Sequence, residues 1–423
     1  MLNVIELFAG VGGFRIGLER TGHFQVVWGN QWEPSKKAQD AFVCYSTNFK
    51  DNGIHSNEDI STVKSEHLPN AEVLVGGFPC QDYSVARSLS GEKGIQGKKG
   101  VLFWEIMRLI SERQQIGRKP KYVLLENVDR LLKSPSKQRG RDFGIMLAAF
   151  HKAGYDVEWR VINAADYGLS QRRRRVFIFA YDRSLKYAKQ LNKTSNPKIL
   201  EQDGFFATKF PVTMEFVNTK KITEGDLKED LVNISDEFKG NFYNSGIMKD
   251  GEFISMELTP LKTAPVPLSD ILEEEVDEKY YLTEMAKEKF IYLKGPKKVE
   301  RTSASGHKYI FSEGGMALPE NMDLPGRTML TSEGTTNRST HVVPDKKTGR
   351  WRYLTPVECE RLNGFPDNWT NTGMSERMRY FCMGNALVVD LITLMGERIH
   401  EIEIQEPQIE KSNEKQEEQI TLF

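Results

Sequence analysis

Two residues that could take part in covalent chemistry follow apolar, strand-like runs. Cys80 comes after VLVGGFP, and Glu126 ends the run YVLLE. A nucleophilic thiol must be held partly exposed in a polar loop that favours the thiolate, and a strand-to-loop junction supplies such a position. A carboxyl group at the end of an apolar strand is partly desolvated, which raises its pKa and allows it to protonate a heterocycle. The alternatives are a buried structural cysteine and a solvated or helix-capping glutamate.

A basic tract, QRRRR at residues 171–175, directly precedes another strand-like run, RVFIFA. Most such tracts are solvated. Beside an active site, guanidinium groups bind phosphate or an anionic intermediate.

A glycine-rich turn follows the first predicted strand. In ELFAGVGGFRIGLE, Gly10, Gly12 and Gly13 let the backbone approach a ligand and place amides at a helix N-terminus. The dinucleotide fingerprint fails because Arg15 stands where its last glycine should be. A plain structural turn is the alternative. The second strand ends at residues 30–33, Asn-Gln-Trp-Glu, which offer an aromatic face for a purine and polar groups for a ribose. The two segments together indicate an adenosine-containing cofactor.

The elements that must position these residues alternate between strands and helices. That order predicts a parallel sheet with helices on both faces, and ligands in such sheets bind beyond the carboxyl ends of the strands. Chemistry is therefore expected in the loops after Phe8, Val27, Val75 and Leu125, with the loop after Ala180 as a further option. The predicted strands are VIELF, QVVWG, VLVGG, YVLLE and RVFIFA, and the predicted helices are Phe14–Arg20, Ser35–Tyr45 and Leu102–Ser111.

The length of 423 residues favours two domains. From about residue 182 the sequence becomes irregular, and an apolar helical pattern returns at 381–400. We predict a catalytic and cofactor-binding domain of residues 1–181 completed by 381–405. Residues 182–380 are expected to form a smaller, irregular, mainly β second domain. The Glu-, Gln- and Lys-rich tail, 406–423, has the composition of a disordered segment.

Composition excludes several classes of protein. The hydrophobic share of 39% and charged share of 28% are those of an ordinary globular protein. No apolar run approaches the roughly 18 residues that span a bilayer, and no signal peptide is recognisable, so we expect a cytoplasmic protein without a membrane partner. None of the four cysteines is spaced as a metal site, and no metal is expected.

The net charge of −1 does not indicate a polyanion ligand. Charge must then be segregated along the chain. Arg172–Arg175 and Lys294–Arg301 are basic, whereas Glu273–Glu278 and the tail after Glu401 are acidic.

Six ordered segments resemble motifs of the DNA (cytosine-5)-methyltransferase family of bacterial modification enzymes. They cover most of residues 1–181 and 351–390. The resemblance implies a Rossmann-like methyltransferase sheet and sequence-specific methylation of cytosine C5 in duplex DNA. It also implies base flipping, covalent addition of Cys80 to C6 and S-adenosylmethionine as methyl donor. The segments are FAGVGG, PCQ, ENV, QRRRR, YLTPVECERLNGFPDNW and GNALVV.

The resemblance also assigns site residues. Glu126 would hold N3 of the cytosine, while Arg173 and Arg175 would contact the flipped nucleotide. The family commonly has an acidic residue before its tryptophan to bind ribose hydroxyls. Here that residue is Gln31, so either Gln31 or Glu33 takes the role. Around the cofactor the resemblance places Phe8, Ala9, Gly10, Gly12, Gly13, Trp32, Asp59, Ile60, Phe78, Leu102 and Asn385.

Sequence reading is expected between the motifs, above all at residues 327–344, whose polar side chains could reach major-groove base edges. A β-hairpin with a polar outer face is the alternative. Residues 351–369 would be scaffold, and Cys359 structural. The candidate DNA contacts are Gln81, Ser84, Arg327, Thr335, Thr336, Asn337, Arg338 and Thr340.

The expected partner is double-stranded DNA, bound by a monomer. A companion restriction endonuclease could act on the same site without forming a stable complex. The rival interpretations are an RNA or transfer-RNA cytosine-5 methyltransferase, a catalytically silent DNA-binding module and a nucleotide-dependent oxidoreductase.

Overall fold

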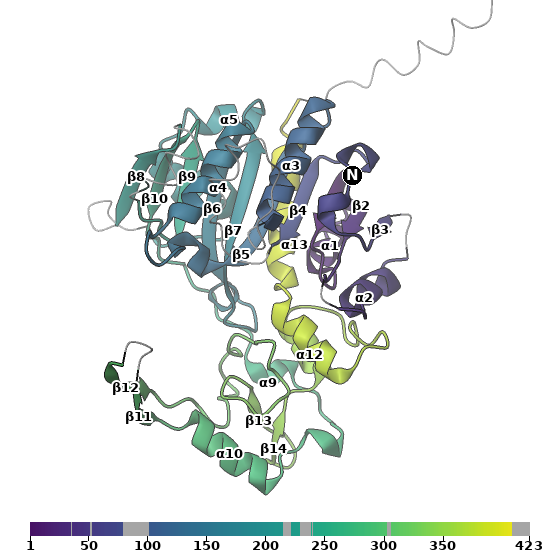
Figure 1. Cartoon of the computed structure of the whole chain (residues 1–423), viewed down its shortest axis with the longest axis vertical. Helices are drawn as coiled ribbons and strands as arrows, with labels where there is room; N and C mark the ends of the chain where they lie inside the picture. Colours follow the sequence, from purple (N-terminus) through teal and green to yellow (C-terminus); the bar gives the residue numbers. More distant parts are fainter. Residues whose placement is uncertain are drawn as a thin grey trace, which may run out of the picture.

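A ten-stranded mixed sheet forms the larger of two lobes (Figure 1). The structure is a computed structural model that describes residues 1–34, 36–50, 53–78, 101–214, 221–228, 238, 240–302 and 306–407. Cys80, Gln81, Ser84 and most of the predicted tail lie outside the described residues. In order across the sheet, the strands are β3 (Ile54–Ser56), β2 (Phe24–Asn30), β1 (Leu2–Leu7), β4 (Val73–Gly77), β5 (Tyr122–Val128), β7 (Arg174–Asp182), β6 (Tyr155–Asn163), β9 (Ser245–Lys249), β10 (Glu252–Met256) and β8 (Ile222–Asp226).

The first five strands of this order are parallel, as predicted, but β7 is antiparallel to β5 and to β6. Only ten residues separate β6 from β7. A parallel crossover needs a dozen or more residues, so the short connection reverses the chain. The suggestion that chemistry lies after Ala180 is therefore wrong, since that end of β7 faces the opposite edge. The start of β7, with its arginines, lies at the carboxyl ends of the parallel strands.

Helices cover both faces of the sheet, as the fold class requires. Two clusters of buried apolar side chains pack between these helices and the sheet. The second predicted helix begins later than expected, at Asp40. The side-chain amide of Gln39 donates to the carbonyls of Glu33 and Lys36 and accepts from the Glu33 N–H, which ties these two residues to the position directly before the helix. The helices of this lobe are α1 (Gly13–Glu19), α2 (Asp40–Asn48), α3 (Val101–Gln115), α4 (Arg141–Lys152), α5 (Lys186–Leu191), α6 (Asn196–Lys198), α7 (Phe205–Lys209) and α13 (Val389–Glu403).

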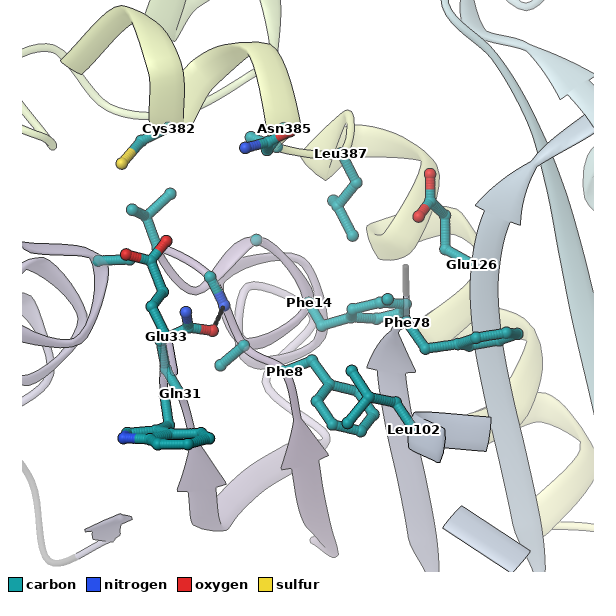
Figure 2. A pocket seen from close by; sticks show the side chains of 18 of the residues that line it. Phe8, Phe14, Gln31, Glu33, Phe78, Leu102, Glu126, Cys382, Asn385 and Leu387 are labelled. Atoms are coloured by element: carbon teal, nitrogen blue, oxygen red, sulfur yellow. Dashed lines mark hydrogen bonds between the residues drawn. The ribbon is translucent and has the colours of Figure 1, made fainter. Parts of the chain in front are cut away.

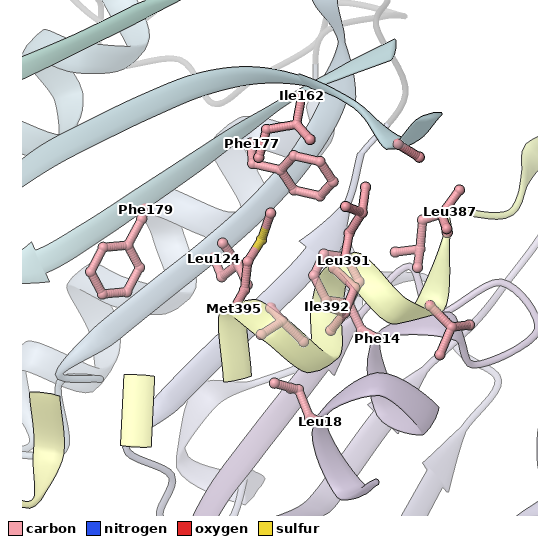
Figure 3. Packing of buried hydrophobic residues seen from close by; sticks show 14 of the residues in the cluster. Phe14, Leu18, Leu124, Ile162, Phe177, Phe179, Leu387, Leu391, Ile392 and Met395 are labelled. Atoms are coloured by element: carbon pink, nitrogen blue, oxygen red, sulfur yellow. The ribbon is translucent and has the colours of Figure 1, made fainter. Parts of the chain in front are cut away.

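The C-terminal helix α13 packs against α1 and the sheet (Figure 3). Its Leu391, Ile392 and Met395 join one cluster with residues of α1, β5 and β7. Glycine permits the close approach, because a Cβ at Gly17 would lie 2.6 Å from Cβ of Ile392. The helical apolar pattern predicted at 381–400 belongs to two helices, α12 (Glu376–Asn385) and α13, bent by 42°. Among the described residues no single helix is long and apolar enough to cross a membrane, and only this bent pair passes such a test together.

The domain boundary expected at residue 182 is wrong. Strands β8, β9 and β10 extend the main sheet, where β9 pairs with β6. Ile254, Met256 and Leu258 join the buried cluster that also holds Phe177 and Phe179 of β7. The second lobe is therefore built from later residues and carries helices as well as two small sheets. Its elements are α9 (Leu268–Ile271), α10 (Glu284–Lys294), β11 (Lys297–Thr302), β12 (Lys308–Glu313), β13 (Val342–Pro344), β14 (Trp351–Tyr353), α11 (Pro356–Leu362) and α12.

Candidate active site

A cavity of about 960 Å³ lies at the carboxyl ends of β1, β2, β4 and β5, and residues of α12 and the turn after it close one side. Figure 2 shows Gln31 and Glu33 toward one end of it, Glu126 and Phe78 toward the other, and Phe8 and Phe14 between them. The sequence-predicted residues that line this cavity are Phe8, Ala9, Gly10, Gly13, Gln31, Trp32, Glu33, Asp59, Ile60, Phe78, Leu102, Glu126, Arg173, Arg175 and Asn385.

The glycine-rich turn has backbone conformations that favour glycine. Gly10 and Gly12 have φ values of 57° and 90°. The N–H of Gly10 donates to Oε1 of Gln31 at 2.8 Å, so the end of β2 holds the turn in place. Gly12 does not line the cavity, which corrects its predicted place beside the cofactor. A Cβ there would lie 2.4 Å from the ring of Phe49, so Gly12 instead allows close packing beneath the turn.

An ion pair closes the end of the cavity near Gln31. Nζ of Lys36 lies 3.1 Å from Oε2 of Glu33 and 4.3 Å from the ring centre of Phe381 in α12. The backbone carbonyl of Gln31 accepts from Nδ2 of Asn57 at 2.6 Å. This end of the cavity thus offers the carboxylate of Glu33 and the side-chain amide of Gln31, with aromatic surface nearby.

Glu126 stands at the opposite end, with 15% of its side chain exposed. Burial raises the pKa of its carboxyl group, while the charges of Arg175 and Arg173 lower it. Nε of Arg175 lies 2.9 Å from Oε1 of Glu126. The carboxyl is therefore held beside a cation without being freely hydrated. Phe78, two residues before Cys80, lines the same cavity, and its carbonyl accepts from Nδ2 of Asn127 at 2.7 Å.

Arg173 ties the two lobes together. Its guanidinium is buried and donates to the carbonyls of Met329 and Gly384 at 3.1 and 3.0 Å. Burial, with help from the charge of Arg175, lowers the pKa of Arg173 to about 9. Two of its nitrogens are thus committed to the protein frame. Of the two predicted nucleotide contacts, Arg175 is the better placed.

Two of the predicted DNA contacts are wrong, because their polar atoms serve the interior of the second lobe. Arg327 makes a two-pronged bond to Glu320, with contacts of 2.7–3.1 Å, and also donates to the carbonyls of Ser339 and Thr340. Thr340 is fully buried and its hydroxyl donates to the carbonyl of Thr335 at 2.6 Å. Neither side chain is available to read a base.

Arg338 is also engaged internally. Its guanidinium donates to the carbonyls of Leu293 and Gly295 near the end of α10 and to that of Gly314 just after β12. This holds the base of the β11–β12 hairpin against residues 327–344.

The other predicted DNA contacts in this segment, Thr335, Thr336 and Asn337, are at least partly exposed. Asn337 is exposed, while its Oδ1 accepts from the Ser339 N–H at 3.1 Å. The hydroxyls of Thr335 and Thr336 are bonded to the Ser332 carbonyl and the Tyr353 hydroxyl. Asn337, Thr335 and Thr336 stay predictions.

Sequence reasoning missed cavity residues that are close in the chain to the predicted site residues, and others that come from the far end of the chain. Asn127 directly follows a predicted strand and could have been found from that position, whereas Lys36 was assigned to a predicted helix. Phe381 and Cys382 come from the far end of the chain, and no local signal marks them, whereas Leu387 lies within the GNALVV segment. The lining residues not predicted are Val11, Phe14, Pro34, Lys36, Ala41, Ser61, Gly77, Phe103, Glu105, Asn127, Val128, Phe381, Cys382, Gly384, Ala386 and Leu387.

Comparison with known proteins agrees with this geometry. A family model described as C-5 cytosine-specific DNA methylase matches residues 2–401. The chain is 56% identical over 406 residues to the Type II methyltransferase M.Sau3AI of Staphylococcus aureus, covering 95% of this chain and 96% of that protein. It is 34% identical over 184 residues to the Type II methyltransferase M.HhaI of Haemophilus parahaemolyticus, covering 44% of this chain and 50% of that one.

Solved structures share the fold. The Dnmt2 methyltransferase of S. pombe aligns with a TM-score of 0.58 at 14% identity, over 95% of this chain and 99% of the other. A putative DNA modification methyltransferase encoded within a prophage of E. coli aligns with a TM-score of 0.51 at 18% identity, over 96% of this chain and 100% of the other. At these identities the likeness concerns the fold alone.

Proposed function

The chain belongs to the family of C-5 cytosine-specific DNA methylases and is a DNA (cytosine-5)-methyltransferase, and from this premise we propose that it acts on a cytosine turned out of duplex DNA, through a covalent bond to Cys80. The observation that carries the proposal is the cavity that joins the glycine-rich turn to Glu126 and Arg175. A cytosine inside a duplex is stacked, so its C5 and C6 can enter such a cavity only after the base is extruded, at a cost of a few kcal/mol.

The residues at the Glu126 end supply the chemistry on the base. Cytosine C5 is a weak nucleophile, so the Cys80 thiolate adds to C6, and the electrons of the C5–C6 double bond shift toward N3. Because burial raises the pKa of Glu126, its carboxyl takes up a proton more readily than a free one, and once protonated it donates to N3 where negative charge develops. Arg175 holds this carboxyl in place. Once C5 carries a methyl group, loss of its proton to a base or water lets the C6–sulfur bond break and returns the electron pair to Cys80.

The other end of the cavity fits S-adenosylmethionine. When bound, this cofactor supplies an electrophilic methyl group to C5. Phe8, Ala9 and Gly10, which line the cavity, would hold the methionine part, and Trp32 would offer a face to the adenine. Oε1 of Gln31 already accepts from the Gly10 N–H, so the amide nitrogen is the part of that side chain better suited to contact the ribose, as a donor. A ribose diol also needs an acceptor, and we assign this role to the carboxylate of Glu33.

The proposal extends to the biological setting. The protein acts as the modification enzyme of a restriction-modification system, in the cytoplasm and as a monomer. A companion endonuclease can share its site without stable association. The second lobe carries the recognition function, with the exposed Asn337 as a candidate base contact.

Two experiments test this function. Bisulfite sequencing of DNA from cells expressing the protein should reveal one short word with a single protected cytosine. Transfer of a labelled methyl group should occur to duplex DNA and not to transfer RNA. If only transfer RNA is labelled, the protein is an RNA methyltransferase and the proposal is wrong. If neither substrate is labelled, a catalytically silent DNA-binding module becomes the better interpretation.

The covalent step has its own test. Duplex DNA containing 5-fluorocytosine at the target should trap an adduct at Cys80, because fluorine cannot leave C5 as a proton does. Peptide mass spectrometry would locate the adduct. An adduct on another residue, or no adduct with active enzyme, would contradict the mechanism.

A further inference from the structure

A two-stranded arm extends from the second lobe beyond one end of α10 (Figure 1). The arm consists of β11 and β12, residues 297–302 and 308–313, paired antiparallel from Lys297↔Glu313 to Thr302↔Lys308. Almost every described residue of the arm is exposed or half-buried. A two-stranded hairpin is at best marginally stable in water on its own, so this arm depends on what it contacts.

The surface of the arm combines apolar, aromatic and basic side chains. Val299 is 43% exposed, Tyr309 42% and Ile310 71%. The pairing places Val299, Arg301, Tyr309 and Phe311 on one face, and the guanidinium of Arg301 stacks 3.8 Å from the ring centre of Phe311. Exposed groupings of this kind mark interaction sites in soluble proteins.

The charge of the arm selects a polyanion over a second copy of the chain. Its cations are Lys297, Lys298, Arg301 and Lys308, against the anions Glu300 and Glu313. Nε of Arg338, which lies outside the arm, is 3.6 Å from Glu313 and offsets that anion. The arm is therefore basic in a chain whose net charge is −1. Lysines on exposed edge strands also oppose pairing with another strand.

The base of the arm is fixed beside residues 327–344. Arg338 bonds to carbonyls on both sides of the arm, at Gly295 and Gly314. Glu320 accepts from the buried ammonium of Lys294, at the end of α10, at 2.9 Å and from Arg327. Burial alone would raise the pKa of Glu320, but Arg327, His341 and Lys294 outweigh it and lower that pKa to about 2. The arm thus keeps a set position relative to the segment expected to read DNA.

We propose that the arm lies against duplex DNA outside the recognised word, where Lys298, Arg301 and Lys308 contact phosphates. The inference rests on the proposed function and adds to it a second, sequence-independent DNA surface. A two-stranded β-ribbon has the width of the major groove, and cations along it neutralise the backbone. The arm would increase affinity without changing which word is methylated.

The test compares two triple variants. The arm variant carries Lys298→Ala, Arg301→Ala and Lys308→Ala. The control variant carries Arg118→Ala, Lys189→Ala and Lys193→Ala, exposed cations at the opposite edge of the large lobe. Fluorescence anisotropy would measure binding of a duplex that extends beyond the methylated word on both sides, over a series of NaCl concentrations. The same titration would be repeated with a shorter duplex that contains the methylated word without the flanking DNA.

The arm variant should bind the long duplex more weakly, with a slope of log affinity against log salt that is smaller by about 0.9 for each lost phosphate contact. The control should match the parent protein, and the short duplex should remove most of the difference. The methylated word should not change. Equal salt slopes for the arm variant and the control would overturn the proposal, as would a concentration-dependent dimer, seen in sedimentation, that the arm variant abolishes. If the parent protein methylates no DNA, the proposed function fails instead.

Discussion

Nε of Arg175 and Oε1 of Glu126 lie 2.9 Å apart, on neighbouring antiparallel strands. Arg175 is paired with Val128, two residues beyond Glu126, so the two side chains are diagonal neighbours on one face of the sheet. This contact exists because β7 runs opposite to β5, which brings the basic tract to the end of the strand that carries the carboxyl group.

Replacing Arg175 by Gln should slow methylation by about 10²–10³-fold, the usual cost of losing one charge-stabilising donor. Burial already raises the pKa of Glu126, and loss of the Arg175 charge would raise it further. The limb of the pH–rate profile that belongs to Glu126 should therefore move to higher pH. Arg174→Gln is the control, since Arg174 is exposed and paired with Asp129. If this limb stays at the same pH in the Arg175 variant, the Arg175–Glu126 pair does not control the titration that limits methylation.

Cys80→Ser should abolish methylation while the affinity for S-adenosylhomocysteine, measured by calorimetry, persists, because the thiol serves the base. Cys382→Ser is a demanding control, since Cys382 lines the same cavity. Burial raises the pKa of the Cys382 thiol to about 12, so it is not a nucleophile at neutral pH and its loss should leave activity intact. Full activity of the Cys80 variant would remove that residue from the mechanism.

Glu33→Gln should weaken binding of S-adenosylhomocysteine by about ten- to hundredfold, the worth of hydrogen bonds to a charged group. The parent protein should prefer the ribose form over its 2′-deoxy analogue, and the variant should lose this preference. Glu58→Gln, a nearby exposed glutamate outside the cavity, serves as control. Retention of the preference in the Glu33 variant would return the role to Gln31.

Glu6 should make the folded protein less stable at alkaline pH. Its carboxyl is fully buried under the glycine-rich turn, where it accepts from the Tyr45 hydroxyl at 2.9 Å and the Arg15 N–H at 3.4 Å. Burial raises its pKa from 4.5 to about 8, although Tyr45 and Arg15 lower it. The stabilising effect of the bound proton is complete below pH 4.5 and is lost as the pH rises through about 8.

The free energy of unfolding should fall by a few kcal/mol across this window, because a pKa difference of one between the folded and unfolded chain is worth about 1.4 kcal/mol. Glu6→Gln cannot ionise, so its free energy of unfolding should depend less on pH across this window. Chemical denaturation of both proteins at a series of pH values would show this. Parallel curves would mean that another group dominates.

Local sequence determined the chemistry-bearing parts of this protein. The places of Glu126, the glycine-rich turn and Gln31 follow from strand-like runs and the loops after them, because such patterns depend on neighbours in the chain. The same reasoning found the basic tract, while Cys80 remains a prediction that lies outside the described residues.

Tertiary structure decided which of those parts meet and which polar groups are left free. The reversal of β7, the addition of β8–β10 to the sheet and the closing of the cavity by Phe381 and Cys382 all depend on pairing between distant segments. The guanidinium of Arg327 and the hydroxyl of Thr340 are a type expected at DNA, yet they bond to Glu320 and to backbone carbonyls. A buried polar group must find a partner, and only the folded chain determines which partner is within reach.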